Sequence, residues 1–167
     1  ARTIDAAGRI VAPGFIDLHS HGDPLETPTL ENFLAMGVTT ISLGQDGSSP
    51  DVVPLSDWLA DVRAGGIGTN LAMFVGHGTL RDQSGIGMSA YPEAEDLQRM
   101  ADMLDEALDY TFGMSSGLEY NPGLNASTDE LRALARVVGA NDRIIMSHMR
   151  NEDDDQLEAS IAELLEQ

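Results

Sequence analysis

Cysteine and lysine are both absent from this sequence of 167 residues. Because there is no cysteine, the chain can form no disulfide and offers no thiolate to a metal ion. No uninterrupted apolar run reaches the roughly 18 residues that a membrane-spanning helix requires. Disulfide scaffolds, thiolate-ligated metal sites and membrane spans are therefore excluded within this sequence.

Positive charge is also scarce. The chain has 28 acidic residues against 9 basic residues, all of them arginine, and its formal net charge is −19. This charge opposes binding to nucleic acid and to anionic membrane surfaces, so we expect neither as a partner. The length suits one domain with a sizeable core. The sequence has no initiator methionine, so we expect it to begin within a longer protein. It shows no signal peptide, and a cytoplasmic location is expected only as the general prior.

Strand-like and helix-like segments alternate along the chain. β-Branched and apolar runs predict strands, and apolar residues at helical spacing predict helices between them. Ser127, followed by an acidic turn, reads as the N-terminal cap of one helix. The acidic run from Glu152 to Asp155 suits the start of the last helix. The predicted strands are 14–19, 38–43, 71–75, 112–118 and 143–147, and the helices lie near 30–37, 56–65, 97–108, 127–138 and 157–165.

This alternation predicts an α/β fold with a parallel sheet and crossover helices. A doubly wound sheet and a barrel both satisfy the pattern. The barrel is favoured because His21, Asp46, His77, Glu119 and His148 all fall at the C-terminal ends of predicted strands, where barrel active sites form. A complete (β/α)8 TIM barrel needs about 250 residues. We therefore expect a partial barrel containing about strands 1–5 and covering residues 13–167.

The most informative segment is PGFIDLHSH at 13–21. Side chains alternate along a strand, so Asp17, His19 and His21 should share one face. Two imidazoles at one strand end suit a borderline-soft divalent metal such as zinc. The alternative is that one histidine is solvated and the other is a satisfied core residue.

This segment resembles the first barrel strand of the metal-dependent amidohydrolases. Further segments, in the same order, resemble the N-acyl-D-amino-acid deacylase (D-aminoacylase) branch of that superfamily. The resemblance covers nearly the whole chain, and it implies that residues 1–12 are the remnant of a small flanking β-domain. The matching segments are GVTT from 37 on to Pro50, VGHGTLR at 75–81, GMSSGLEYNPG at 113–123 and SHMRNE at 147–152.

The resemblance implies that His19, His21 and His148 bind a divalent metal, most simply zinc. D-Aminoacylases usually read G-N-C-G where this chain has Gly44-Gln45-Asp46-Gly47, so Asp46 takes the place of a cysteine ligand. Aspartate is a harder ligand and would admit manganese, iron or cobalt more readily. Asp46 could instead be an ordinary turn residue before glycine.

Glu119 is the rival anionic ligand, because related amidohydrolases place a bridging lysine or glutamate at that strand end. It could also be a carboxylate that orients a metal-bound histidine. His77 and Tyr120 are expected near the metal or substrate. Arg81 and Arg150 could bind a substrate carboxylate bidentately or form structural ion pairs.

The function implied by the resemblance is metal-dependent hydrolysis of N-acyl-D-amino acids by an activated water. The general-base aspartate of the eighth strand and the histidine ligand of the sixth would lie outside this sequence, in the remainder of the same barrel. Two alternatives stay open. One is a cyclic-amide or dipeptide amidohydrolase, such as a dihydroorotase, hydantoinase or isoaspartyl dipeptidase relative, although the chain lacks the lysine that bridges their metals. The other is a non-catalytic barrel homologue.

Overall fold

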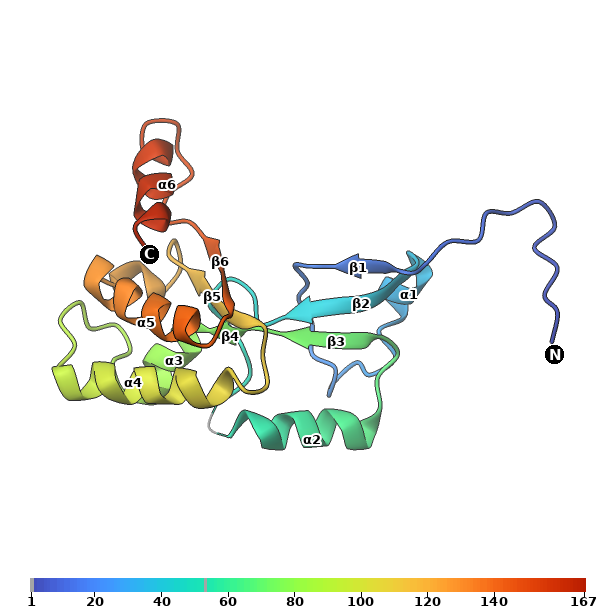
Figure 1. Cartoon of the computed structure of the whole chain (residues 1–167), viewed down its shortest axis with the longest axis horizontal. Coiled ribbons are helices and arrows are strands. Elements are labelled where there is room, and N and C mark those ends of the chain that lie inside the picture. The colour runs from blue at the N-terminus through green and yellow to red at the C-terminus, as the bar shows by residue number, and fades with distance from the viewer. Residues whose placement is uncertain (1, 53) are drawn as a thin grey trace.

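The computed structural model describes residues 2–52 and 54–167. Its helices and strands alternate along the chain (Figure 1). The strands are β1 (Phe15–Asp17), β2 (Val38–Leu43), β3 (Asn70–Met73), β4 (Val75–Gly76), β5 (Gly113–Gly117) and β6 (Ile144–His148). The helices are α1 (Glu31–Ala35), α2 (Leu55–Gly65), α3 (His77–Ser84), α4 (Ala94–Ala107), α5 (Thr128–Ala140) and α6 (Leu157–Leu165), with a 3-10 turn, η1, at Gly123–Asn125.

The strands pair in parallel and in chain order, β1-β2-β3 in one sheet and β4-β5-β6 in the next. The two sheets share one interrupted strand, because only Phe74 separates β3 from β4. The Phe74 amide still donates to the Leu43 carbonyl at 2.9 Å, and the Phe112 amide donates to the Met73 carbonyl at 2.9 Å. Sequential parallel order differs from a doubly wound sheet, in which the strand order reverses at a switch point. The predicted α/β fold with a parallel sheet is confirmed.

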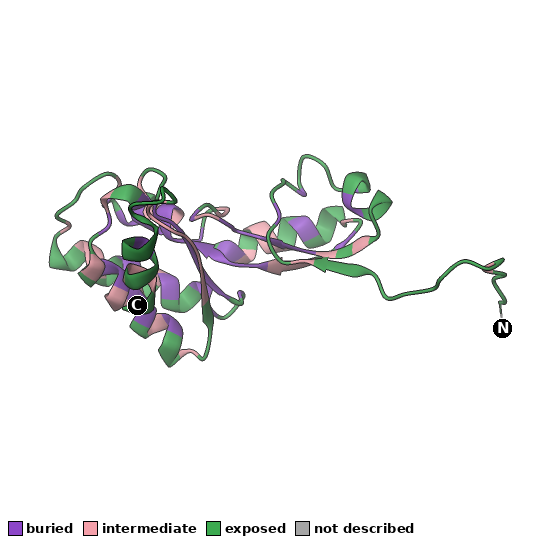
Figure 2. Ribbon diagram, turned by 90° about the horizontal axis from the view of Figure 1, so that it is seen from above, coloured by how far each residue is buried: buried purple, intermediate pink, exposed green. Residues whose placement is uncertain are grey.

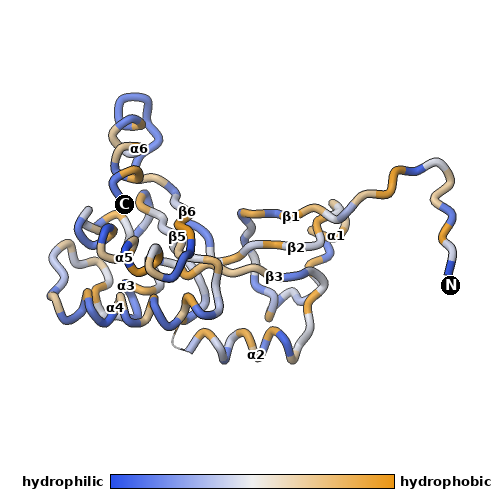
Figure 3. Tube along the Cα trace, viewed as in Figure 1, coloured by the Kyte–Doolittle hydropathy of each residue, from blue (hydrophilic) through white to orange (hydrophobic). Residues whose placement is uncertain are grey.

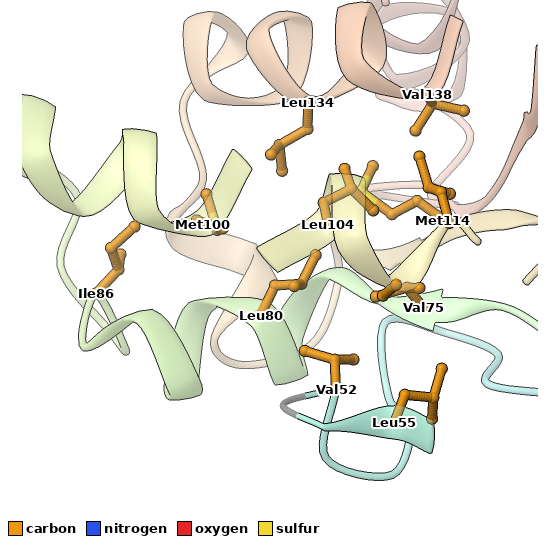
Figure 4. Packing of buried hydrophobic residues seen from close by; sticks show 12 residues of the cluster. Val52, Leu55, Val75, Leu80, Ile86, Met100, Leu104, Met114, Leu134 and Val138 are labelled. Carbon is orange, nitrogen blue, oxygen red and sulfur yellow. The ribbon is translucent and has the colours of Figure 1, made fainter. Parts of the chain in front are cut away.

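The main hydrophobic core lies between β4, β5 and the helices α3, α4 and α5 (Figure 4). Met100 and Leu104 of α4 are wholly buried, as the apolar stripe on that helix predicts. Figure 3 shows the matching alternation of hydrophilic and hydrophobic residues along α4, and the hydrophilic loop that precedes α6. Helix α3 packs against this core through Leu80. It is the one α-helix among the described residues that the sequence did not predict. The buried members of the cluster are Val52, Leu55, Val75, Leu80, Ile86, Met100, Leu104, Ala107, Leu108, Met114, Leu134 and Val138.

Both outer strands carry exposed apolar side chains. Phe15 and Ile16 of β1 are 66% and 64% exposed, and Ile144 of β6 is 57% exposed. Figure 2 shows this exposure along the β1 edge and over the N-terminal segment. Residues 2–14 form no strand and extend away from the sheet (Figure 1). Assignment of residues 1–12 to a β-domain stays a prediction. No helix among the described residues is long and apolar enough to cross a membrane.

Candidate metal centre

The polar side chains singled out in the sequence gather where the parallel strands end. His19 and His21 follow β1, Asp46 follows β2, Glu119 follows β5, and His148 is the last residue of β6. Parallel strands present all their C-terminal ends at one edge of a sheet, which explains how residues far apart in sequence meet there.

The two histidines after β1 converge on one atom. The Nε2 atoms of His19 and His21 each lie 3.0 Å from Oδ2 of Asp46. Their rings meet edge to face, with centroids 5.3 Å apart. The backbone amide of His19 donates to the Asp17 carboxylate at 3.1 Å, which holds the chain in a tight turn as it leaves the strand. His19 and His21 converge as expected, but β1 ends at Asp17, so a turn rather than alternation along a strand brings them together.

Asp46 is both a turn residue and a site residue. It occupies a turn closed by a 2.9 Å hydrogen bond from the Ser48 amide to the Gln45 carbonyl. Asp46 and Gly47 have φ values of 54° and 77°, the pattern of a type I′ turn, which favours Asp-Gly at its centre. A Cβ on Gly47 would lie 2.7 Å from the Gly117 amide nitrogen, so glycine is required there. The two interpretations of Asp46 are thus compatible.

His148 links this cluster to a second group of carboxylates. Its Nδ1 lies 3.6 Å from Oδ1 of Asp46, and its Nε2 lies 2.9 Å from Oε2 of Glu119. Glu152, which sequence reasoning attributed only to the start of a helix, places Oε1 3.6 Å from the same Nε2. No local signal predicted this contact, because residues 149–152 form a loop rather than a helix. Two groups of potential ligands result, one of His19, His21 and Asp46 and one of Glu119, His148 and Glu152.

The donor set fits a divalent cation. Imidazole nitrogen together with carboxylate oxygen suits zinc and the neighbouring transition metals. Oδ1 of Asp46 is buried and has no hydrogen-bond partner, a costly arrangement that a cation would relieve. Ligands 2.0–2.1 Å from a tetrahedral ion lie roughly 3.3 Å apart. The 3.0 Å separations between Asp46 Oδ2 and the two Nε2 atoms are close to that spacing.

Tyr120 borders the cluster. Its hydroxyl lies 3.3 Å from Nε2 of His148, and the two rings are 4.6 Å apart. Desolvation, followed by the negative charges of Asp46, Glu119 and Glu152, raises the pKa of this phenol above its ordinary value. A phenol is already protonated at neutral pH at its ordinary pKa of about 10, so the hydroxyl can donate a hydrogen bond. Tyr120 also lines a cavity of about 300 Å³ with His21, Asp46 and Gly117, which places it where a substrate would meet the cluster.

His77 and Arg81 belong to a buried network. Arg81 forms the structural ion pair that was the alternative to substrate binding, and the expected place of His77 near the metal or substrate stays a prediction. Both side chains are wholly buried. The carboxylate of Glu130 accepts hydrogen bonds from His77 Nε2 at 2.8 Å and from Arg81 at 3.0 and 3.1 Å. Arg81 also donates to the carbonyls of Gly87 and Ser89. This network ties α3 to α5 beneath the site.

Arg150 forms the structural ion pair that was the alternative to substrate binding. Its guanidinium donates to both carboxylate oxygens of Glu163 at 2.8–3.2 Å. It also donates to the carbonyls of Leu124 and Ala126, at 2.7 and 3.0 Å. Arg150 thereby connects the segment after β6 to α6 and η1.

This chain is similar in sequence and in fold to known proteins. N-acyl-D-glutamate deacylase of Alcaligenes xylosoxydans xylosoxydans is 38% identical to it, over 98% of this chain and 38% of that protein. The crystal structure of N-acyl-D-glutamate deacylase from Bordetella bronchiseptica, complexed with zinc and a phosphonate mimic of the reaction's tetrahedral intermediate, matches with a TM-score of 0.89 and 36% identity, over 96% of this chain and 38% of that one.

A third match is D-aminoacylase, whose structure defines a novel subset of amidohydrolases. It gives a TM-score of 0.81 at 29% identity, over 90% of this chain and 37% of that one. No protein-family model matches the chain. The chain therefore spans less than two-fifths of the length of the proteins that it resembles, and it resembles them over nearly all of its own residues.

Proposed function

This chain belongs to the D-aminoacylase branch of the amidohydrolases, and we propose that the whole protein hydrolyses the amide bond of N-acyl-D-amino acids with the help of a divalent metal. The observation that carries this proposal is the position of the Asp46 carboxylate, which lies 3.0 Å from His19 and His21 and 3.6 Å from His148. Three imidazoles around one carboxylate, at the ends of parallel strands, form a metal centre where α/β barrels hold their catalytic residues.

We propose zinc as the metal, with manganese, iron or cobalt as alternatives. His19, His21 and Asp46 would hold one ion, and His148 with Glu119 would contribute on the far side of Asp46, which leaves room for a second. A bound divalent ion supplies Lewis acidity toward the substrate carbonyl and makes a water nucleophilic at neutral pH. The protonated hydroxyl of Tyr120 is placed to donate to a substrate oxygen in the adjoining cavity.

We also propose that the described strands, with β3 and β4 counted as one interrupted strand, are the first five of a (β/α)8 barrel. Three features support this: the sequential parallel order, the exposed apolar edges at β1 and β6, and the limited share of the relatives' length that the chain covers. Covering those edges would remove the unpaired strand groups that an open sheet exposes. The remaining strands would supply the general base and a further histidine ligand. A cytoplasmic location and a β-domain formed with residues 1–12 stay predictions.

The test uses the full-length protein and pairs each N-acetyl-D-amino acid with its L-enantiomer. We expect turnover of D-forms only, inhibition by a chelator, and recovery on addition of zinc, manganese or cobalt. The His19→Ala variant serves as a metal-deficient control. Metal-dependent turnover restricted to L-forms or to cyclic amides would contradict the substrate proposal and leave the superfamily assignment intact. A folded protein that holds no metal and turns over nothing would favour a non-catalytic homologue.

A further inference from the structure

The side chain of Gln45 joins the ends of two strands. It is 1% exposed, and its amide nitrogen lies 3.1 Å from the carbonyl oxygen of Leu18 and 3.0 Å from Oγ of Ser42. A longer contact, at 3.4 Å, reaches the Ser42 carbonyl. Leu18 follows β1, and Ser42 lies near the end of β2. One buried amide therefore binds both strands at the edge where the histidines and Asp46 meet.

The neighbours of these acceptors are the candidate ligands. Leu18 directly precedes His19, and Gln45 itself directly precedes Asp46. The imidazoles of His19 and His21 are 48% and 65% exposed, so packing of the rings themselves does little to hold them. Beyond the last pair of the β1-β2 ladder, a backbone bond from the Ser20 amide to the Ser42 carbonyl, at 3.0 Å, also joins the two strand ends.

The orientation of the amide is set by its surroundings. The Leu18 and Ser42 carbonyls only accept hydrogen bonds, so the nitrogen of Gln45 must face them rather than the oxygen. The oxygen, Oε1, is then buried without a partner. An unpaired buried acceptor costs free energy, and such breaches concentrate at functional sites. An apolar side chain of similar size would avoid that cost, but it would remove the donor that the Leu18 carbonyl receives.

We propose that Gln45 is a positioning residue of the metal centre: it holds the strand end that carries His19 and His21 at the distance from Asp46 that metal binding requires. The inference rests on the proposed function, since it concerns the same centre. It goes beyond that function by assigning the centre's geometry to a residue whose side chain bonds to Leu18 and Ser42 rather than to any candidate ligand. Groups that orient metal ligands typically alter metal affinity by roughly 10–100-fold when they are replaced.

The test measures zinc affinity of the full-length protein by competition with a chromophoric chelator. We expect Gln45→Leu, which keeps the volume and removes the donors, to weaken zinc binding by roughly 10–100-fold. Activity should recover when zinc is saturating, because the ligands themselves are intact. Gln45→Glu should bind zinc more weakly than wild type as well, since a carboxylate would face two carbonyl oxygens. Gln45→Asn, which retains the amide at shorter reach, should be less impaired than Gln45→Leu.

Asn70→Leu is the matched control. The Asn70 amide also donates to β2, to the Thr39 carbonyl at 2.9 Å and to Oγ1 of Thr40 at 3.3 Å, but at the opposite end of the strand. The Asn70→Leu substitution should leave zinc affinity unchanged. Wild-type affinity in Gln45→Leu, or equal loss in Asn70→Leu, would overturn the proposal. If Gln45→Leu does not fold, Gln45→Glu is judged by the same criterion. Failure of the wild-type protein to bind zinc would instead refute the proposed metal centre itself.

Discussion

Oδ1 of Asp46 lies 3.6 Å from Nδ1 of His148, although their strands are not neighbours in the sheet. Asp46 follows β2 and His148 ends β6, with the strand formed by β3 and β4 and then β5 between them. Adjacent strands lie about 4.8 Å apart, so three steps across a flat sheet would separate the two strand ends by roughly 14 Å. The loop after β2 closes this gap, because it lies against β5: a Cβ on Gly117 would clash with the Asp46 carbonyl oxygen.

This geometry ranks the two anionic ligands. Asp46 contacts His19, His21 and His148, whereas Glu119 contacts His148 alone among these histidines. We expect Asp46→Asn to lower metal content far more than Glu119→Gln. Both substitutions keep the side-chain shape, so elemental analysis of the dialysed variants isolates the effect of charge. Loss of metal from Glu119→Gln, with normal content in Asp46→Asn, would reverse the ranking.

The hardness of the Asp46 carboxylate should set metal preference. In Asp46→Cys, a thiolate would replace carboxylate oxygen, and softer ligands favour zinc over manganese. We therefore expect the ratio of zinc affinity to manganese affinity to rise in Asp46→Cys. Cysteine at a positive φ adds strain of about 1–2 kcal/mol, so overall stability should fall slightly. Competition titrations with the two metals measure the ratio. An unchanged ratio would mean that residue 46 does not bind the ion.

The buried network around Glu130 should stabilise the fold without serving the metal. Glu130→Gln removes the negative charge that faces buried Arg81, and an unpaired buried charge costs about 3–5 kcal/mol. The matched control is Glu166→Gln, because Glu166 pairs with Arg132 at the surface, where such pairs contribute about 1 kcal/mol or less. Denaturant unfolding compares the two variants. Normal stability together with loss of zinc in Glu130→Gln would show that this network belongs to the active site after all.

The pair formed by Arg150 and Glu163 offers a test of whether this arginine binds substrate. As a structural pair, it should hold α6, so Arg150→Ala and Glu163→Ala should both speed amide hydrogen exchange along that helix. Neither should change KM. If Arg150 binds the substrate carboxylate instead, Arg150→Ala should raise KM while Glu163→Ala does not. Hydrogen-exchange mass spectrometry and steady-state kinetics on the same pair of variants distinguish these outcomes.

Local signals in the sequence were sufficient for most elements. The predicted strands at 38–43 and 112–118 correspond to β2 and β5, and the stripe containing Met100 and Leu104 is buried in α4. The Ser127 hydroxyl caps α5 by accepting from the Glu130 amide at 3.2 Å. Periodicity and capping act within a few residues, so they are readable without knowledge of the fold. The spacing of His19 and His21 belongs to the same class of signal.

The tertiary structure decided what these elements place together. Glu130 occupies the position of a capping-box glutamate, yet its carboxylate binds His77 and Arg81, which lie 53 and 49 residues earlier. The same packing formed α3 and buried two residues that, from sequence, resembled substrate ligands. The bond from Gln45 to Leu18 spans 27 residues and has no local signature. Residue type and spacing determined which chemistry was possible; burial and contacts between distant segments selected the residues that form the centre and those that support it.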